Sequence, residues 1–408
     1  MASQRFDDLT IQRWVNGGDG LAIVESGEHE GLVVFVPGTV PGDRVDVSIT
    51  QKKKRWARGE VTRRRQDSDA RVVPKCAVQD MCGGCPWMVG SPELQRAEHR
   101  RILVAEVTKR LGQFIAAEDA ERIVGDDVTH GNEWSYRNRL RVVYSVGSSG
   151  KVTLGFRQAG GGSIVDVDSC VVAQPALQEA IPRLKKHLVG RSNEVGEVRL
   201  LAGREGVAGA IEVRGRRVEP WGESHVTVHV GDAILRLGPE SFVQGNPEVA
   251  AKIAADVERV AKAAGGRHAV ELFCGAGTFT VPLLKAGYAV AGYDVAGECE
   301  TAFVNATEGL GEAWFHPQDL LGLSPYPTPP PKDPGLILLD PPRSGAGEVV
   351  DWIAQTQATT VIMVSCDIAT GLRDTAKLLA AGFECVAIQS YDLFPHTGHQ
   401  ELLIHLVR

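Results

Sequence analysis

The chain has 408 residues, of which 43% are hydrophobic and 23% are charged. These proportions exclude a disordered or fibrous chain, and no apolar run approaches the ~18 residues of a membrane span. The first sixteen residues lack a basic stretch followed by an apolar core, so no secretory signal is expected. We therefore expect a cytoplasmic protein of two to four domains, whose eight cysteines stay reduced.

The net charge of −7 is distributed unevenly. Residues 51–65 hold eight cations against one acid, Glu60, so this window carries +7 and the rest of the chain −14. Such asymmetry is typical of a surface that faces phosphates, although a solvated charge run or a linker has the same composition. The candidate nucleic-acid contacts are Lys52, Lys53, Lys54, Arg55, Arg58, Arg63, Arg64 and Arg65.

Residues 8–65 are expected to form a small all-β unit. Short alternating stretches at 20–24, 31–36, 44–50 and 56–63 are separated by turn residues such as Pro and Gly. This pattern favours a five-stranded barrel of the oligonucleotide-binding type, with the basic window at its end.

The rest of the chain changes pattern twice. A cysteine- and glycine-rich stretch at 66–91 precedes a predicted helix at 92–112, and 134–240 is mostly β-like with one helix near 175–189. From residue 247 onward helices and strands alternate, which predicts a parallel sheet with right-handed crossovers. The expected helices are 247–264, 278–286, 297–308, 347–356 and 369–381, and the expected strands are 268–273, 288–293, 335–339, 360–365, 383–392 and 400–407.

Residues whose side chains could take part in a reaction follow several of these strands. Cys366 ends the apolar run Val361–Ser365. Ligands of open α/β sheets bind beyond the carboxyl ends of the strands, so this thiol is a candidate nucleophile. An isolated buried cysteine is more often an inert small hydrophobe, but the neighbouring motifs favour the nucleophile.

The strand predicted at 268–273 runs into a glycine turn that contains Gly275 and Gly277. Glycines allow the backbone to approach a ligand closely, and Asp294, at the end of the next strand, is placed to hold ribose hydroxyls. The spacing is not the full G-x-G-x-x-G pattern, which favours S-adenosylmethionine over a nicotinamide cofactor. A plain strand-to-helix turn without a ligand is the alternative. Asp340-Pro-Pro-Arg343 after another strand forms a rigid wall, because proline fixes φ and lacks an N–H.

Together these motifs resemble the RNA uracil-5 methyltransferase family, in particular the branch with a TRAM domain and an iron–sulfur cluster, which mostly modifies large-subunit ribosomal RNA. The resemblance covers nearly the whole chain. Its motifs are Cys76-x5-Cys82-x2-Cys85, Phe242-Val-Gln-Gly-Asn246, Glu271-Leu-Phe-Cys-Gly-Ala-Gly277, Asp340-Pro-Pro-Arg343, Ser365-Cys-Asp367 and Asp392-Leu-Phe-Pro-His-Thr-Gly-His-Gln-Glu401.

The resemblance implies a Rossmann-like catalytic domain and assigns roles to single residues. Cys366 is the implied nucleophile and Glu401 the implied base; His396 and His399 are the other candidate bases. Thr278 and Asp319 stand where some members of the family carry Asn. The residues implied around S-adenosylmethionine are Gln244, Phe273, Gly275, Gly277, Thr278, Asp294, Asp319 and Asp340.

The implied chemistry is covalent catalysis. A thiolate that adds to carbon 6 of uracil turns the ring into an enolate, whose carbon 5 attacks the methyl group. A base then removes the carbon 5 proton so that the sulfur can leave. Asp367 beside the nucleophile argues against a simple electrostatic lowering of the thiol pKa unless its side chain faces away. A target within folded RNA must also be turned out of its stack.

The cysteine-rich stretch predicts a metal centre. Cys76, Cys82 and Cys85 share a loop with Gly83 and Gly84, and Cys170 is the position matching a fourth ligand. Four thiolates fit a [4Fe–4S] cluster, with zinc as the alternative.

The sequence therefore predicts an α/β methyltransferase of three domains: a TRAM domain at 1–65, an iron–sulfur α+β domain at 66–240, whose helix 92–112 is a candidate to pack on the catalytic domain, and a Rossmann-like domain at 241–408. The expected partner is RNA, with 23S ribosomal RNA favoured over transfer RNA, and no membrane or obligate protein partner is expected. The alternatives are a methyltransferase for another nucleobase and a non-catalytic RNA-binding protein.

Overall fold

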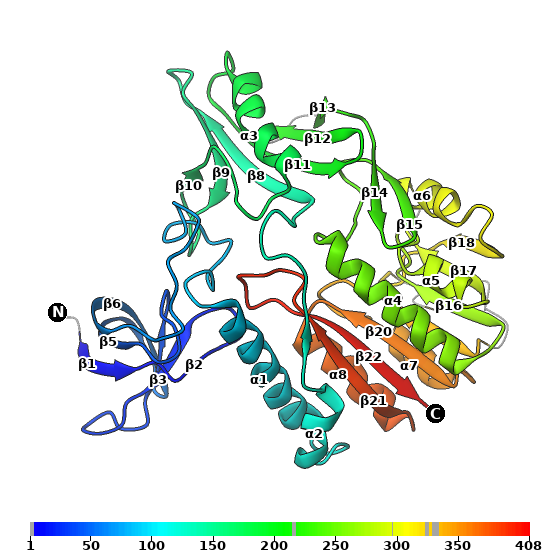
Figure 1. Cartoon of the computed structure of the whole chain (residues 1–408), viewed down its shortest axis with the longest axis horizontal. Helices are drawn as coiled ribbons and strands as arrows, with labels where there is room; N and C mark the ends of the chain where they lie inside the picture. Colours follow the sequence, from blue (N-terminus) through cyan, green and yellow to red (C-terminus); the bar gives the residue numbers. More distant parts are fainter. Residues whose placement is uncertain (1–3, 214–217, 296, 323–325, 329–333) are drawn as a thin grey trace. The chain divides into compact units, whose positions relative to one another are not determined.

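Figure 1 shows a computed structural model of the chain, which describes residues 4–213, 218–295, 297–322, 326–328 and 334–408. The chain folds as two compact units. The predicted domain boundaries near residues 65 and 240 stay predictions. The first unit comprises Met1–Ile102, Phe156–Val165 and Phe394–His399, and the second Leu103–Gly155, Asp166–Leu393 and Gln400–Arg408.

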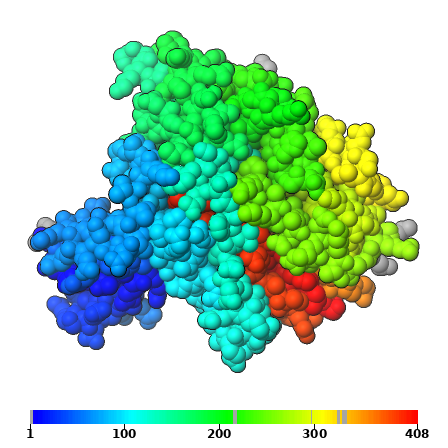
Figure 2. Space-filling model, in the orientation of Figure 1, coloured from blue at the N-terminus to red at the C-terminus, as the bar shows by residue number. Residues whose placement is uncertain are grey.

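The first unit begins with a six-stranded sheet, drawn in blue in Figures 1 and 2. Alternate residues of its strands point inward and bury a valine-rich core, including Val34, Val36, Val45 and Val47. Its order is β1-β5-β6-β4-β3-β2, and β4 and β6 are its parallel pair. The strands are β1 (Arg5–Thr10), β2 (Arg13–Trp14), β3 (Gly20–Ile23), β4 (Val33–Val36), β5 (Arg44–Lys52) and β6 (Trp56–Gln66).

The four predicted strands of this sheet are confirmed, but it has six strands instead of five. β2 is only two residues long, and β1 is largely exposed and polar, so neither has the alternation that marks a half-buried strand.

Helix α1 (Pro92–Leu111) follows the cysteine-rich loop. Ser91 caps its start, since the Ser91 hydroxyl accepts a hydrogen bond from Leu94 N at 3.3 Å. Leu103, Val107 and Leu111 form a buried stripe at helical spacing. A short helix that the sequence did not predict, α2 (Ala117–Val124), comes next.

The second unit contains an antiparallel layer in which β11 lies between β8 and β12. Helix α3 packs on this layer through Leu177, Ile181 and Leu184, and β14 and β15 form a separate hairpin. The elements of this part of the chain are β8 (Arg139–Val146), β9 (Val152–Arg157), β10 (Ile164–Asp166), α3 (Pro175–Leu188), β11 (Glu194–Gly203), β12 (Gly206–Val213), β13 (Val218–Gly222), β14 (Val226–Val230) and β15 (Ala233–Leu237). The end of β9 and most of β10 belong to the first unit.

An eight-stranded sheet forms the C-terminal half of this unit, with the order β18-β17-β16-β19-β20-β22-β21-β7 (Figure 1). β19 and β20 are buried along their whole length, as expected for central strands of a covered parallel sheet. The strands are β7 (Val128–Thr129), β16 (His268–Leu272), β17 (Ala289–Asp294), β18 (Ala313–Pro317), β19 (Leu336–Leu339), β20 (Thr360–Ser365), β21 (Glu384–Tyr391) and β22 (Glu401–Val407).

The alternation of helices and strands is confirmed, and the predicted bounds of the first helix match those of α4. The sheet is mixed rather than purely parallel, because β22 runs antiparallel to both β20 and β21. None of the described helices is long and apolar enough to span a membrane. The helices are α4 (Pro247–Ala264), α5 (Thr280–Lys285), α6 (Glu298–Thr307), α7 (Val349–Gln355) and α8 (Ile368–Ala380).

Candidate active site

The strand order of the large sheet reverses between β16 and β19. From β16 the chain proceeds to β17 and β18 on one side, and then returns to β19 and β20 on the other. Such a switch point opens a crevice outside the carboxyl ends of the strands, which is where open α/β sheets bind ligands. Phe273, Asp294, Asp340 and Cys366 all lie at or directly after the carboxyl ends of these strands.

The glycine turn after β16 has a strained backbone. Phe273 has φ of 61°, which is unusual for a residue with a side chain, and Gly275 and Gly277 have φ of 51° and 87°. Two contacts with the end of β17 hold the turn: Phe273 N donates to Tyr293 O at 2.8 Å, and Gly275 N donates to Asp294 Oδ2 at 2.7 Å. The predicted loop and the predicted acid are thus joined directly.

Gln244 and Asp340 form a second joined pair. The buried Gln244 side chain donates from Nε2 to Asp340 Oδ2 at 3.2 Å. Asn246, two residues on, caps α4 by accepting a hydrogen bond from Val249 N at 3.3 Å. The cap fixes the segment that carries Gln244 relative to the start of this helix.

Thr278 and Asp319 are less closely connected to the other predicted cofactor residues. Thr278 is half-buried in the turn before α5, and Asp319 is exposed two residues after β18. Asp319 Oδ1 accepts a hydrogen bond from Leu321 N at 3.0 Å. Within the described part of the chain, neither side chain is hydrogen-bonded to another of the predicted cofactor residues.

Cys366 and Glu401 are brought together by strand register. β20 and β22 are antiparallel, and the last pair of their register is Ser365 with Leu402. The next residues outward are Cys366 and Glu401, and directly opposed residues have Cβ atoms about 4.5–5.5 Å apart. Glu401 is 1% exposed. Its Oε1 has no hydrogen-bond partner within the described ranges.

Burial and neighbouring carboxylates raise the pKa of both groups. Burial, and then the charges of Glu401 and Asp340, raise the pKa of the Cys366 thiol to about 11, against the opposing effect of Arg343. The pKa of Glu401 is raised well above its ordinary value by burial and then by Asp340, again opposed by Arg343. In the unliganded protein the Cys366 thiol is therefore neutral at pH 7.

Asp367 does not contribute to this effect, although it follows Cys366 in the sequence. Its Oδ1 accepts a hydrogen bond from Thr370 N at 2.9 Å, which makes it the N-cap of α8. The side chain therefore serves the helix terminus, and the groups that shift the pKa of Cys366 do not include it. The sequence left its orientation open.

The carboxyl groups along the strand ends affect one another. Burial and the nearby Asp294 raise the pKa of Asp340 to about 7, against the hydrogen bond from Gln244. The pKa of Asp294 is itself raised by burial, against hydrogen bonds from two backbone N–H groups. Burial, Asp340 and Asp294 raise the pKa of Glu271, at the end of β16, to about 8, although a hydrogen bond from Thr280 opposes them. A site this rich in carboxyl groups suits a positively charged ligand.

Arg343 was part of a sequence motif but received no role there. It is exposed, and its positive charge lowers the pKa of both Cys366 and Glu401. The signal for it was its position three residues after Asp340, at the end of a rigid Pro-Pro segment.

The two histidines proposed as other bases lie in the first unit, in the segment Phe394–His399. His396 is buried with φ of 71°, and its backbone is held on both sides. Its N–H donates to Gln95 Oε1 at 2.8 Å, and its carbonyl accepts from Trp87 N at 3.0 Å. These contacts favour a structural role for His396.

The loop that contains Cys76, Cys82 and Cys85 also belongs to the first unit, whereas Cys170 lies in the second unit. Cys82 is close enough to Cys76 for the two thiols to interact, and the backbone of Gly84 is hydrogen-bonded to Cys82. Within the described residues, no three His, Cys, Asp or Glu side chains gather closely enough to hold a metal ion. The predicted cluster therefore stays a prediction.

All eight predicted nucleic-acid contacts are exposed on the N-terminal sheet. Arg58, Arg64 and Arg65 form ion pairs with acids of the first unit. Lys53, Lys54 and Arg55 form the turn between β5 and β6, where Lys53 N donates to Trp56 O at 2.8 Å, and this part of the structure gives their side chains no ion pair. This turn therefore carries three positive charges that are not paired with acids of the described structure.

Comparisons with known proteins agree with this geometry. Residues 8–62 match the family described as TRAM domain. The 23S rRNA (uracil(1939)-C(5))-methyltransferase RlmD of Chromohalobacter salexigens is 30% identical, over 98% of this chain and 89% of that protein. The protein of the same name from Cronobacter sakazakii is also 30% identical, over 94% of this chain and 93% of its own length.

A solved structure shares the fold. The tRNA (uracil-54, C5)-methyltransferase of Pyrococcus abyssi, in complex with S-adenosyl-L-homocysteine, superposes with a TM-score of 0.71 at 22% identity and covers 98% of this chain and 100% of that one.

The sheet with its switch point, the glycine turn and the acids around it define an S-adenosylmethionine-dependent methyltransferase with an N-terminal TRAM domain. More narrowly, the chain belongs to the family of the 23S rRNA (uracil-C5)-methyltransferases named RlmD. The resemblance seen in the sequence is thereby confirmed at the level of the family, and the chain is an RNA uracil-C5 methyltransferase.

Proposed function

We propose that this enzyme methylates carbon 5 of one uridine in 23S ribosomal RNA, the counterpart of the uridine for which its relatives are named, through a covalent bond between Cys366 and the uracil. The observation that carries the proposal is the opposition of Cys366 and Glu401 across β20 and β22, beside Asp340. A thiol and a carboxyl beside the strand ends where the cofactor is expected support the roles of nucleophile and base.

In the proposed reaction the Cys366 sulfur bonds to carbon 6 of the uracil, and its proton passes to water. Carbon 5 then takes the methyl group, and Glu401 removes the proton that carbon 5 still carries. The carbon–sulfur bond breaks as the ring regains its double bond, and the released thiolate takes up a proton. A deprotonated Glu401 is required at the last step.

We assign the cofactor site to Gln244, Phe273, Gly275, Gly277, Thr278, Asp294, Asp319 and Asp340. S-adenosylmethionine, when bound, supplies the methyl group. The residues fit this cofactor. Gly275 and Gly277 have positive φ and no side chain, so the ligand can approach their backbone closely. Asp294 and Asp340 offer negative charge to a cationic ligand. Asp319 is exposed, whereas the other seven residues are buried or half-buried.

For the RNA we assign the basic residues of the N-terminal sheet, with Lys53, Lys54 and Arg55 as the leading contacts. Their charges are not committed to acids of the protein, so they are available for phosphates. The salt dependence of RNA affinity tests this assignment, because removal of three phosphate contacts flattens the slope of log K against log salt by about 2 to 3.

The iron–sulfur cluster belongs to this proposal as well. Support comes from the family motif, from the interaction of Cys76 with Cys82 and from the Gly84 backbone hydrogen bond to Cys82. Backbone N–H groups directed at cysteine sulfur are common around such clusters. Iron and sulfide content with visible absorbance after anaerobic purification would establish the cluster, and zinc content would establish the alternative. Cys170→Ser tests the fourth ligand by the same readouts.

Nucleoside analysis tests the function itself. The full-length protein is incubated with S-adenosylmethionine and either a 23S rRNA fragment or transfer RNA, and the digested RNA is searched for 5-methyluridine. The proposal expects the product in the ribosomal fragment. Product in transfer RNA alone would identify transfer RNA as the substrate. Methylated purines would overturn the proposed methylation of uracil. Failure to bind S-adenosylmethionine would favour a non-catalytic RNA-binding protein.

A further inference from the structure

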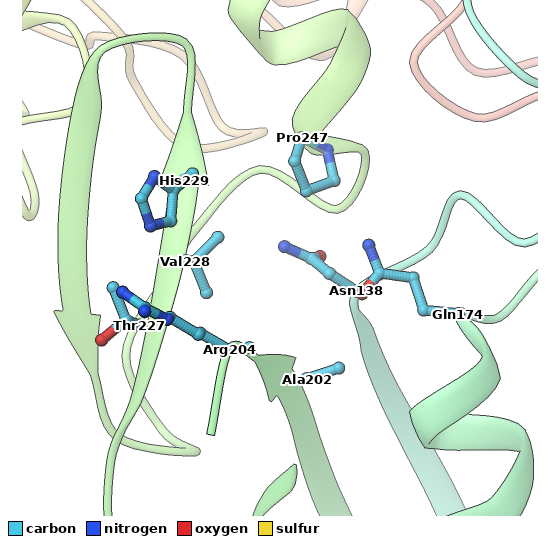
Figure 3. A pocket seen from close by; sticks show the side chains of 9 residues that line it. Asn138, Gln174, Ala202, Arg204, Thr227, Val228, His229 and Pro247 are labelled. Atoms are coloured by element: carbon cyan, nitrogen blue, oxygen red, sulfur yellow. The ribbon is translucent and has the colours of Figure 1, made fainter. Parts of the chain in front are cut away.

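A pocket of about 250 Å³ lies within the second unit, between the antiparallel layer, the β14–β15 hairpin and the start of α4 (Figure 3). It is lined by Asn138, Gln174, Ala202, Gly203, Arg204, Thr227, Val228, His229 and Pro247. None of the predicted catalytic, cofactor or metal residues is among them. Pockets for drug-sized ligands hold about 300–1,000 Å³, so this one suits a single ring system.

Asn138 is the unusual member of this lining. The residue is 1% exposed, and neither its side-chain oxygen nor its nitrogen has a hydrogen-bond partner in the described structure. An unpaired buried polar group costs about 1–3 kcal/mol. Figure 3 shows the Asn138 amide directed into the space between Val228 and Pro247. A ligand with an adjacent donor and acceptor would satisfy both ends of this amide.

Two hydrogen bonds fix the backbone of Asn138 beside the pocket. Its N–H donates to Gly245 O at 3.1 Å, and its carbonyl accepts from Ala202 N at 2.8 Å. The residue is thus fixed between the end of β11 and the segment that precedes α4, and its side chain is held toward the pocket.

The remaining walls have complementary chemistry. Ala202, Val228 and Pro247 are apolar, while Arg204 and His229 are exposed at the rim. No lining residue is acidic, and the Arg204 guanidinium forms no ion pair within the described residues. Thr227 is already engaged, since its N–H and hydroxyl both donate to Glu205. A flat polar ring with a phosphate nearby matches such a pocket: the amide reads the ring edge, and the cation meets the phosphate.

We propose that this pocket binds an unstacked base of the RNA substrate other than the uridine that is methylated. The inference rests on the proposed function, because it assumes an RNA substrate. Asn138 would contact the edge of the base, His229 would stack on it or flank it, and Arg204 would contact its phosphate. Asparagine pairs most readily with the N6/N7 edge of adenine, which makes adenine the leading base.

The pocket is coupled to the methyl-transfer site through a short path. Asn138 N is hydrogen-bonded to Gly245 O, and the neighbouring Gln244 is hydrogen-bonded to Asp340. A base held by Asn138 would therefore anchor the RNA at a fixed place relative to the segment that carries Gln244. Its effect should appear in RNA binding rather than in the chemical step.

Steady-state kinetics of the full-length enzyme on the ribosomal fragment test the proposal. Asn138→Ala should raise KM for RNA about 10- to 100-fold, the range of one good amide–base pair, while kcat and KM for S-adenosylmethionine stay within about twofold. His229→Ala and Arg204→Ala should raise KM for RNA by smaller factors. Arg236→Ala, an exposed arginine on β15 outside the pocket lining, is the matched control and should leave KM unchanged.

A scan of the RNA identifies the partner. Each unpaired nucleotide near the target is replaced in turn by an abasic residue. One abasic position should raise KM for the wild-type enzyme and add no further penalty with Asn138→Ala, since both changes remove the same contact. Penalties that add at every position, or variant KM values within twofold of wild type, would overturn the proposal and leave a pocket that holds water only.

Two controls keep the outcomes separate. If Asn138→Ala does not fold, as judged by circular dichroism and cofactor binding, the abasic scan is read with His229→Ala and Arg204→Ala. If the wild-type enzyme makes no 5-methyluridine, the proposed function fails; the pocket is then judged from the affinity of the same variants for the same fragments.

Discussion

Burial and then the negative charge of Asp340, which follows β19, raise the pKa of the Glu401 carboxyl at the start of β22. The same two groups also raise the pKa of Cys366. In the resting enzyme the Cys366 thiol is therefore protonated at pH 7, and it must lose its proton during turnover. The pH dependence of the reaction should show this.

We expect the single-turnover rate to rise with pH between 6 and 9, because the reactive thiolate is the minor form below its pKa of about 11. The slope should be about tenfold per pH unit, as for one essential group titrating above the range. Quenched single-turnover assays with saturating RNA and S-adenosylmethionine measure it. A flat profile over this range would show that the liganded site has already ionised Cys366.

Asp340→Asn should shift this profile to lower pH. The substitution removes a negative charge that raises the pKa of both Glu401 and Cys366, while the amide keeps the size of the side chain. The matched control is Asp351→Asn on α7, a carboxyl that does not act on either group. A shift of the same size in both variants would show that the effect is not local to the site.

Trapping experiments test the proposed roles of Cys366 as nucleophile and Glu401 as base separately. Cys366→Ala should form no methylated product and no covalent RNA complex, because no sulfur is available for carbon 6. Glu401→Gln should still form the bond and then release product about 10²–10⁴-fold more slowly, the usual contribution of one general base. A methylated protein–RNA complex stable on denaturing gels is the readout.

Cys385→Ala is the control for loss of a half-buried thiol, and it should retain both steps. Normal product release by Glu401→Gln would remove the residue from the mechanism.

Gln95 holds the loop that leads to Glu401. Its Oε1 accepts from His396 N, and its Nε2 donates to Trp87 O at 3.1 Å and to Gly90 O at 2.9 Å. The contacts keep His396 at its positive φ, a conformation that costs a residue with a side chain about 1–3 kcal/mol. Gln95→Ala removes the side-chain partner of the His396 N–H and of the Gly90 carbonyl, while the Trp87 carbonyl keeps the Gly90 N–H, and it should lower the free energy of unfolding by about 2–4 kcal/mol.

Denaturant unfolding measures this change, and Gln51→Ala, an exposed glutamine of β5, is the control. If both variants unfold at the same denaturant concentration, Gln95 does not hold the loop.

Some helices and strands could be predicted from the sequence and others could not. The bounds of α4 were predictable because Asn246 and Pro247 mark its start and Gly265 follows its end. β18 was missed because it is a short edge strand that alternates only weakly between half-buried and exposed positions. The antiparallel placement of β22 could not be predicted either, since hydrophobic periodicity does not specify which strand is the neighbour.

The site shows the same division. Motifs identified Cys366, Asp340 and Glu401 one by one, but their mutual effect on pKa depends on register and burial that no motif encodes. The cap formed by Asp367 settles an orientation that the sequence left open. Asn138 gave no signal at all, because a single asparagine before a strand is ordinary until its side chain is found buried and unpaired.

Glu271 should make the stability of the unliganded enzyme depend on pH. Burial raises its pKa from the ordinary 4.5 to about 8, so between these values the folded protein holds a proton that the unfolded chain has lost. The folded state binds more protons in this window, and the free energy of unfolding must therefore fall as pH rises, by about 1.4 kcal/mol per pH unit for one such group.

Glu271→Gln keeps the shape of the side chain without the ionisation, so the free energy of unfolding of this variant should vary less between pH 5 and 8. Chemical denaturation across this range measures the two slopes, and Glu258→Gln, whose carboxyl has a lowered pKa on α4, is the control. Equal slopes for wild type and Glu271→Gln would show that Glu271 is ionised in the folded protein, and the charge expected along the strand ends would then have to be revised.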